Sequence, residues 1–471
     1  MSERDDFLYD DEILNSVNRY EDMIRNHKRY FFDVYEFENI IDYYLNTENF
    51  SRAAQAADYA VHLYPSATSI QLRIAEIMID NSQPAKALSL LNRLEQIEAD
   101  DYAVYLLKGS ALNMLGKPKE AQRQFEKALS LADENKLDVL YDIGVSFEQI
   151  NRHKMALKYF LKVYAMEPEY YYVYYDLAYC YDRINEPDKS ILFYRKYLDE
   201  EPFSEHVWYN LGIVYNKKDD DEKAIEAYDY ALAINPDYSS AIFNKANTLT
   251  LMNRYKEAVV TYRDFLRLEP DSAAAYCYIG ECYEKTGNTG KATACFRKSM
   301  ALDDSFADAW FGMGLIFADA ENYGEAIRYI EQALKLDKEN TDYIFALASV
   351  YTGARQYDDA VSLFKRLTQL IPDDEILWDN FAQTYAMQEK YVHAQQVITE
   401  GLRNNPESAL LRYHLAAYYL LNDDRLQGLT ILKESLNRYA DRIDLFFDLF
   451  DKNIRDDEVM ALVNSFRTNK S

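Results

Sequence analysis

Residues 205–238 read EHVWYNLGIVYNKKDDDEKAIEAYDYALAINPDY, and this stretch decides how the whole chain is organised. Its positions are numbered 1 to 34, and eight of them, 4, 7, 8, 11, 20, 24, 27 and 32, carry Trp208, Leu211, Gly212, Tyr215, Ala224, Tyr228, Ala231 and Pro236. The same pattern recurs every 34 residues from Val34 to Arg442, with one extra residue at Lys136. Twelve repeats result, and they begin at residues 34, 68, 102, 137, 171, 205, 239, 273, 307, 341, 375 and 409.

Two positions of the repeat carry short side chains. Position 20 holds Ala53, Ala87, Ala121, Ala156, Ser190, Ala224, Ala258, Ala292, Ala326, Ala360, Ala394 and Gly428. Position 8 holds Ile41, Ala75, Gly109, Gly144, Ala178, Gly212, Ala246, Gly280, Gly314, Ala348, Ala382 and Ala416. Two helices approach each other closely only where side chains are short, so these positions predict the contact between the two helices of one hairpin. Ile41 departs from the pattern and predicts a looser first hairpin.

Every proline of the chain fits this register. Seven prolines lie at position 32, namely Pro65, Pro168, Pro202, Pro236, Pro270, Pro372 and Pro406, and three lie at position 17, namely Pro84, Pro118 and Pro187. Proline inside a helix removes a hydrogen bond and clashes with the preceding turn, but it is tolerated in the first turn. The prolines therefore mark the boundaries of two helices in each repeat.

The large side chains predict how the hairpins associate. Position 11 carries Tyr44, Met78, Leu112, Phe147, Tyr181, Tyr215, Leu249, Tyr283, Phe317, Tyr351, Tyr385 and Tyr419, and with positions 4 and 7 it forms one apolar helical stripe. One hairpin cannot bury the stripes of both of its helices, so neighbouring hairpins must stack. We expect an all-α solenoid of tandem helical hairpins.

This pattern resembles the tetratricopeptide repeat family. The resemblance implies a right-handed superhelix whose concave groove is lined by the first helix of each repeat, and in which peptides usually bind. The expected organisation is an acidic N-terminal segment with a capping helix over residues 1–33, twelve repeats over 34–442, and a degenerate capping repeat over 443–471.

The expected groove face of the first helix is rich in aromatic side chains, amides and acids, where a charged face would be ordinary. We predict that the partner-binding residues are Tyr141, Asp142, Tyr172, Tyr175, Asp176, Tyr179, Tyr209, Asn210, Ile213, Phe243, Asn244, Asn247, Phe311 and Phe345. Tyrosine combines a flat apolar body with a hydroxyl group at low entropy cost, which suits a binding surface. The resemblance implies that the three asparagines hold the backbone of an extended peptide.

Two other interpretations of this face stay open. The aromatic row at position 5 consists of Tyr141, Tyr175, Tyr209, Phe243, Phe311 and Phe345. These rings could pack against adjacent first helices and stiffen the array, and the amides and acids could simply be solvated. Chaperone-binding members of the family hold a terminal carboxylate with lysine and arginine at positions 2, 5 and 6. Here Arg73 is the only such residue, so that ligand is not expected. The acids favour a basic or neutral partner segment.

The formal net charge of -27 disfavours polyanionic partners, so neither nucleic acid nor an anionic membrane surface is expected. The chain begins without a basic and apolar leader, and it has no run of about 18 uncharged apolar residues. We therefore expect a cytoplasmic protein without membrane insertion. With that location, the four cysteines are expected to be reduced.

Catalytic and metal-binding signatures are missing from the sequence. Cys277 and Cys282 lie five residues apart on one expected helix, and no histidine joins them at ligand spacing. With Cys180 and Cys295 they are expected to be buried structural thiols. No metalloprotease, nucleophile-elbow or phosphate-loop motif occurs. We expect no enzyme, no cofactor and no metal site.

The sequence thus predicts a scaffold or adaptor that holds an extended peptide or partner segment in its concave groove. One alternative is a regulatory sensor of a small molecule or a short signalling peptide. Another is a scaffold that works through its convex face or through self-association into a homo-oligomer. Mutation of the groove would leave the complexes of the last class intact.

Overall fold

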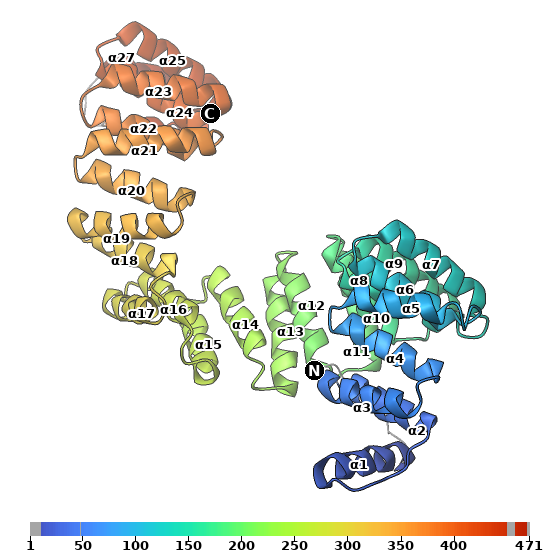
Figure 1. Ribbon diagram of the computed structural model, residues 1–471. Coiled ribbons are helices and arrows are strands. Elements are labelled where there is room, and N and C mark those ends of the chain that lie inside the picture. Colours follow the sequence, from blue (N-terminus) through green and yellow to red (C-terminus); the bar gives the residue numbers. More distant parts are fainter. Residues whose placement is uncertain (1–10, 48, 450–456, 469–471) are drawn as a thin grey trace. The chain divides into compact units, whose positions relative to one another are not determined.

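The computed structural model describes residues 11–47, 49–449 and 457–468, and within these ranges every regular element is a helix (Figure 1). The expected all-α fold of tandem hairpins is therefore confirmed. The chain divides into two compact units, residues 1–248 and 249–471, and the boundary falls inside helix α14.

The helices of the first unit are α1 (Asp11–Asn26), α2 (Val34–Asn46), α3 (Phe50–Leu63), α4 (Thr68–Asp80), α5 (Pro84–Leu94), α6 (Tyr102–Met114), α7 (Pro118–Leu131), α8 (Lys136–Gln149), α9 (His153–Met166), α10 (Tyr172–Arg183), α11 (Pro187–Glu200), α12 (Glu205–Asn216) and α13 (Asp221–Ile234), followed by α14 (Ser239–Leu251) at the boundary. The helices of the second unit are α15 (Tyr255–Leu268), α16 (Ala273–Lys285), α17 (Thr289–Leu302), α18 (Ala307–Asp319), α19 (Tyr323–Leu336), α20 (Thr341–Gly353), α21 (Tyr357–Leu370), α22 (Glu375–Ala386), α23 (Tyr391–Asn404), α24 (Ala409–Leu421), α25 (Arg425–Tyr439), the short 3₁₀ helix η1 (Ala440–Arg442), α26 (Asp444–Leu449) and α27 (Asp457–Thr468).

The helices follow the 34-residue register. From α2 to α25, each even-numbered helix is the first helix of a repeat (helix A), and each odd-numbered helix is the second (helix B). The prolines at position 17 are the first residues of α5, α7 and α11, where their missing N–H group is not needed. The prolines at position 32 lie beyond the ends of the B helices, so the boundaries predicted from proline are confirmed.

The short side chains form the contact inside each hairpin. The residues at position 20 are buried throughout, and eleven of them, from Ala53 to Ala394, have no exposed surface. At position 8, a Cβ atom added to Gly109 would lie 2.2 Å from a ring carbon of Phe125, and one added to Gly212 would lie 2.5 Å from Tyr228. Position 8 therefore faces position 24, where the large ring needs the space that glycine leaves.

The turn between helices A and B has one residue with a left-handed backbone. Position 15 has a positive φ angle in eleven repeats, at Ser82, Gly116, Asn151, Asn185, Asp219, Asn253, Gly287, Glu321, Arg355, Glu389 and Asp423. Only two of these residues are glycine, although glycine adopts this conformation without steric cost. The remaining repeats store a small backbone strain in this turn.

Replacement of Arg355 by glycine is expected to stabilise the second unit by about 0.5 kcal/mol. The left-handed conformation costs a non-glycine residue about 1–2 kcal/mol, whereas the greater freedom of glycine in the unfolded chain costs about 0.4–1 kcal/mol. Arg355 has a φ angle of 62° and an exposed side chain, so replacing it by glycine removes little packing. Urea unfolding followed by circular dichroism measures the change. The reverse substitution, Gly287→Ala, is the control and should destabilise; an equal loss in both variants would contradict the expectation.

In seven repeats, a hydrogen bond from position 4 ties the A helix to the segment that precedes it. The donor side chain reaches the backbone carbonyl six residues earlier, at position 32, in seven repeats: Gln71 to Pro65, Tyr105 to Ala99, Tyr174 to Pro168, Trp208 to Pro202, Trp310 to Asp304, Trp378 to Pro372 and Arg412 to Pro406. The bond satisfies a carbonyl just beyond the end of helix B, where the helix itself offers no partner. This explains why position 4 favours side chains that combine a long apolar body with a donor.

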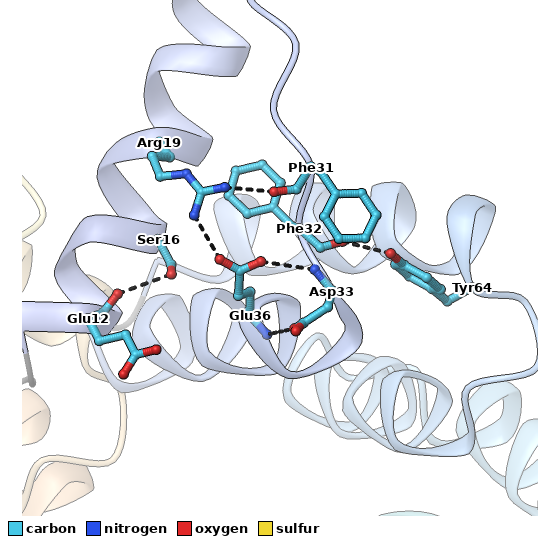
Figure 2. Close-up of polar contacts among 8 residues, drawn as sticks. All are labelled: Glu12, Ser16, Arg19, Phe31, Phe32, Asp33, Glu36 and Tyr64. Atoms are coloured by element: carbon cyan, nitrogen blue, oxygen red, sulfur yellow. Dashed lines mark hydrogen bonds and ion pairs between the residues drawn. The ribbon is translucent and has the colours of Figure 1, made fainter.

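Helix α1 covers the free side of the first hairpin. Arg19 of α1 forms an ion pair with Glu36 of α2 at 2.8 Å and donates to the carbonyl oxygen of Phe31 at 2.7 Å (Figure 2). Its guanidinium group also lies 4.8 Å from the centre of the Phe32 ring, and the Tyr64 hydroxyl donates to the Phe32 carbonyl. These contacts fix the connection between α1 and α2 against the first repeat.

The last repeats are closed by α26 and α27. Phe446 of α26 and Val459 and Val463 of α27 are buried in one apolar cluster with residues of α24 and α25. His414 of α24 links this end to the preceding repeat: its Nδ1 contacts Asp379 of α22, and its Nε2 lies 3.1 Å from the carbonyl oxygen of Leu445. Both ring nitrogens therefore contact oxygen atoms, one in the preceding repeat and one at the start of α26.

Candidate partner-binding surface

The predicted amides and tyrosines are joined to one another on the A helices of the first unit. Asn210 of α12 donates to the Tyr175 hydroxyl of α10 at 3.2 Å, and Asn244 of α14 donates to the Tyr209 hydroxyl of α12 at 3.1 Å. Each bond runs from position 6 of one repeat to position 5 of the preceding repeat. These asparagines therefore use one amide hydrogen to fix neighbouring A helices in register.

The aromatic row at position 5 packs against its own hairpin as well. Its rings contact the rings at position 24 of the same repeat in four cases, with centroid distances of 5.6–6.1 Å: Tyr141 with Phe160, Tyr175 with Tyr194, Tyr209 with Tyr228, and Phe345 with Phe364. The rings at position 5 in these repeats are half-buried rather than sealed. Each ring thus stabilises the hairpin through one face and leaves part of its surface accessible.

The predicted residues differ in exposure. Tyr172 is exposed at 46% and stacks on Tyr171 with a centroid distance of 4.2 Å. Asp142 is exposed, whereas Asp176 is buried, with only 8% of its surface exposed. The remaining predicted residues are half-buried: Tyr141, Tyr175, Tyr179, Tyr209, Asn210, Ile213, Phe243, Asn244, Asn247, Phe311 and Phe345. Phe311 and Phe345 belong to the second unit, where the Phe311 ring packs 4.6 Å from Tyr343. The twelve others belong to the first unit.

A second row of polar contacts links consecutive A helices and was not recognised in the sequence. It joins position 12 to position 10 of the next repeat in five places: Asn113 with Ser146, Glu148 with Cys180, Asn216 with Thr248, Thr250 with Cys282, and Thr352 with Thr384. The signal was present as a polar residue at position 12 followed 32 or 33 residues later by serine, threonine or cysteine. These side chains hold the A helices of consecutive repeats together.

The cysteines belong to this structural layer. Cys180, Cys277 and Cys282 are buried, as expected, and Cys295 is half-buried. The Cys180 thiol donates to a carboxylate oxygen of Glu148 at 3.6 Å, and burial raises the pKa of this thiol. Among the residues that the structure describes, no three histidine, cysteine, aspartate or glutamate side chains are grouped in a way that could hold a metal ion.

Glu148 is the carboxyl group whose protonation depends most clearly on this stacking. Burial, and next the charge of Asp176, raise its pKa from 4.5 to about 8, while the Cys180 thiol opposes the rise. The folded state thus retains a proton that the unfolded chain has lost. The resulting stabilisation is complete below pH 4.5 and disappears as the pH rises through about 8.

Glu148→Gln is therefore expected to stabilise the first unit at about pH 8 and to flatten the decline of the unfolding free energy between about pH 6 and pH 8. Glutamine has the same shape and can still accept the thiol hydrogen of Cys180. Urea unfolding curves at the two pH values measure the slope. The exposed Glu134→Gln substitution is the matched control, and a wild-type slope in both variants would argue against the assignment.

Two open crevices lie at equivalent places on the side of the B helices, one in each unit. The first, with a volume of about 530 Å³, lies between α11, α12 and α13 and is lined by Trp208, Tyr215 and Tyr230. The second, with a volume of about 610 Å³, lies between α21, α22 and α23 and is lined by Trp378 and Tyr385. In both crevices the A helix forms the floor with its residues at positions 4, 7 and 11.

Comparison with known proteins agrees with this geometry. Models described as tetratricopeptide repeats match residues 39–104, 102–135 and 141–205, and a model described as the C-terminal ARM domain of tetratricopeptide repeat protein 21 matches residues 194–380. The search of curated protein sequences returns no match. No helix in the described ranges is long and apolar enough to cross a membrane.

Solved structures of repeat proteins match parts of the chain at low sequence identity. A chain in the structure of the APC/C hetero-tetramer Cut9–Hcn1 is 15% identical, with 85% of this chain and 91% of that chain covered and a TM-score of 0.43. The C-terminal part of a repeat protein from Cytophaga hutchinsonii is 19% identical over 51% and 99%, with a TM-score of 0.45. YrrB, whose structure is described as having an unusual peptide-binding site, is 24% identical over 40% and 96%, with a TM-score of 0.33. The chain belongs to the tetratricopeptide repeat family.

Proposed function

We propose that the chain is a protein-interaction scaffold that holds an extended partner segment on the A-helix face of its first unit. The observation that carries the proposal is the ladder in which Asn210 bonds Tyr175 and Asn244 bonds Tyr209. It sets partly accessible rings, hydroxyls and amides at one fixed interval along a face that would ordinarily be charged. An extended peptide presents its side chains and backbone groups at regular spacing and suits such a surface.

The charge of the surface favours a neutral or basic partner segment. Asp142 is exposed on α8, and the chain as a whole carries a formal charge of -27. Complementary charge mainly speeds the encounter and selects among partners, whereas the rings contribute the buried apolar area. Tetratricopeptide repeat proteins are typically interaction scaffolds, and this chain would use the same face for that purpose.

The test must change the accessible atoms of this face without removing rings that hold the hairpins together. Tyr175 and Tyr209 pack on Tyr194 and Tyr228, so their replacement by alanine would also disturb the fold. The better face variant combines Tyr172→Ala, Asn210→Ala and Asn244→Ala. Peptides are first selected on the immobilised full chain from a random phage library, and their affinities are then measured by fluorescence anisotropy.

The face variant is expected to weaken these peptides about tenfold or more, because contacts at the centre of an interface carry most of its energy. The matched control combines Leu192→Ala, Phe203→Ala and Tyr230→Ala, which are exposed at 52–77%. Unchanged affinity in the face variant, with circular dichroism as for the wild type, would reject the proposal. The crevices beside Trp208 and Trp378 favour a second candidate function on the B-helix side, and loss of binding in the control variant alone would support it.

A further inference from the structure

Two consecutive B helices, α7 and α9, carry matching rows of exposed cations. Lysine or arginine occupies positions 18, 22 and 26 in both repeats, namely Lys119, Arg123 and Lys127 on α7 and Lys154, Lys158 and Lys162 on α9. These are the only two places in the sequence where three cations follow one another at intervals of four residues. All six residues are exposed. We call this set the basic grid.

The two rows belong to helices that flank one ring of α8. Phe147 of α8 packs against Phe125 of α7 at a centroid distance of 5.6 Å and against Tyr159 of α9 at 5.7 Å. An α-helix rises about 1.5 Å per residue, so successive cations in a row are separated by about 6 Å along the helix axis. The grid therefore presents regular steps of positive charge on two neighbouring helices.

The acids closest in sequence do not balance the grid. In the part of the chain that the structure describes, none of the six cations forms an ion pair. Helix α9 has no acidic residue, and α7 has two. Glu120 pairs instead with Lys117 at 3.6 Å, and Glu126 accepts a hydrogen bond from Gln122 at 3.0 Å. Both carboxylates of α7 are thus engaged outside the grid.

The rows are electrostatically unfavourable in the free chain. Like charges four residues apart on a helix repel each other, and each row contains two such pairs. Other B helices offset their cations with acids: Lys223 pairs with Asp220 at 2.5 Å, and Arg328 pairs with Glu325 at 2.6 Å. The uncompensated charge on α7 and α9 is therefore a local exception in a chain whose formal charge is -27, and an acidic partner would relieve it.

Tyrosine rings hold part of the grid in place. The ammonium groups of Lys162 and Lys158 lie 5.1 and 6.0 Å from the centre of the Tyr159 ring, and that of Lys127 lies 5.7 Å from the centre of the Tyr105 ring. Such contacts attract a cation to the ring face. They restrict long side chains before any partner arrives, so less rotamer entropy is lost on binding.

We propose that the basic grid is a docking surface for an acidic protein segment. An extended segment places every second side chain on one face at intervals of about 6.6 Å, which is close to the spacing of the cations. Aspartate or glutamate at three alternate positions would meet the three cations of one row. A nucleic acid or a bilayer surface fits less well, because it would extend beyond the grid onto a strongly acidic chain.

The grid goes beyond the proposed function and uses none of its residues. The A-helix face favours a neutral or basic segment, whereas the grid on the B helices selects for acids. A scaffold with both surfaces would hold two partner segments of opposite charge at the same time. Each surface can therefore be tested by itself.

The test measures binding of a fluorescein-labelled peptide of alternating glutamate and serine to the full chain by fluorescence anisotropy. The same peptide with glutamine in place of glutamate is the uncharged control. The acidic peptide should bind saturably and the glutamine peptide should not. Two grid variants, Lys119→Gln, Arg123→Gln, Lys127→Gln and Lys154→Gln, Lys158→Gln, Lys162→Gln, should each weaken the acidic peptide about tenfold, since its acids lose their complementary charges.

The matched control variant is Lys256→Gln, Lys298→Gln, Lys335→Gln. It removes the same charge from exposed residues on B helices of the second unit and should bind the acidic peptide as the wild type does. Each grid variant loses two like-charge pairs, so its midpoint in urea unfolding should equal or exceed that of the wild type. Weaker binding in the grid variants is then not a consequence of unfolding.

Three results would overturn the assignment. The first is that the acidic peptide binds no better than the glutamine peptide. The second is that the control variant weakens it as much as the grid variants do. The third is that a single-stranded oligonucleotide or phosphatidylglycerol vesicles bind more tightly than the peptide and lose this binding in the grid variants, because the grid would then take phosphate groups. The face variant Tyr172→Ala, Asn210→Ala, Asn244→Ala should bind the acidic peptide normally, which separates failure of the grid from failure of the proposed function.

Discussion

Replacing Gly109 by leucine is expected to lower the unfolding free energy of the first unit by about 3 kcal/mol, near the upper end for an overpacked core. Three carbons of the Phe125 ring lie 2.2–2.8 Å from the place where a Cβ atom would be added. Phe125 has no exposed surface, so its ring has no solvent-facing space into which to move. The hairpin of α6 and α7 must separate or the ring must leave its rotamer.

Alanine at the same place should be much milder. Another hairpin of the first unit already has alanine, Ala178, at position 8 and a large ring, Tyr194, at position 24, so this register accommodates one methyl group once the two helices adjust their spacing. The better helix propensity of alanine offsets part of the strain, by about 0.5–1 kcal/mol relative to glycine. We therefore expect Gly109→Ala to change stability by less than a third of the leucine effect in urea unfolding.

The first repeat suggests how a hairpin with a leucine or isoleucine at position 8 can regain its stability. There Ile41 is fully buried, and position 24 holds Ala57 instead of an aromatic residue. The double variant Gly109→Ile, Phe125→Ala copies this exchange and should recover a large part of the stability that Gly109→Ile loses alone. Equal or greater destabilisation in the double variant would show that position 8 does not face position 24 in the way that the distances indicate.

The same comparison shows what the sequence could predict. Proline and the small residues at positions 8 and 20 reflect constraints that act on one residue at a time, so their recurrence was enough to place the helices and the hairpin contact. The exchange between Ile41 and Ala57 involves two residues at once. Considered alone, Ile41 predicted a looser hairpin, which stays a prediction; the structure buries Ile41 completely, and position 24 of that repeat holds Ala57 instead of a ring. Its partner was visible in the sequence, although only a pairwise comparison of positions 8 and 24 would have found it.

The links between repeats were missed for the same reason. Asn113 and Ser146 are unremarkable polar residues, and their bond depends on packing that brings residues 33 apart into contact. The predicted residues Tyr175 and Asn210 do lie together, but the sequence did not indicate that they bond each other. The crevices beside Trp208 and Trp378 also escaped prediction, because a crevice is defined by the space that three neighbouring helices leave unfilled.

His414 shows how far burial can change the meaning of a residue. It occupies position 6, on the expected groove face, yet its side chain is 3% exposed and contacts Asp379, whose side chain is 8% exposed. The contact joins position 6 to position 5 of the preceding repeat, as in the bond between Asn210 and Tyr175. The second unit thus uses a buried pair of histidine and aspartate where the first unit uses a half-buried pair of asparagine and tyrosine.

His414→Ala is consequently expected to destabilise the second unit by about 3 kcal/mol, because it leaves a buried carboxylate oxygen of Asp379 without its hydrogen-bond partner. Gln383 still donates to Oδ2 of Asp379 at 2.8 Å, but Oδ1, which His414 contacts, loses its partner. The variant also removes the contact to the Leu445 carbonyl, so α26 should lose protection in hydrogen exchange before the rest of the unit. Asn210→Ala, at the equivalent place, should cost only about 1 kcal/mol.

The double variant Asp379→Leu, His414→Leu separates the two contributions. If the loss in His414→Ala comes from a buried carboxylate oxygen without a partner, the apolar pair should regain most of the stability, since replacing both partners of a buried polar contact by apolar groups can be nearly neutral. Protection of α26 should nevertheless remain low, because leucine offers no donor to the Leu445 carbonyl. Recovery of both quantities together would mean that His414 holds α26 only through packing, and recovery of neither would mean that the pair is needed for its shape rather than its hydrogen bond.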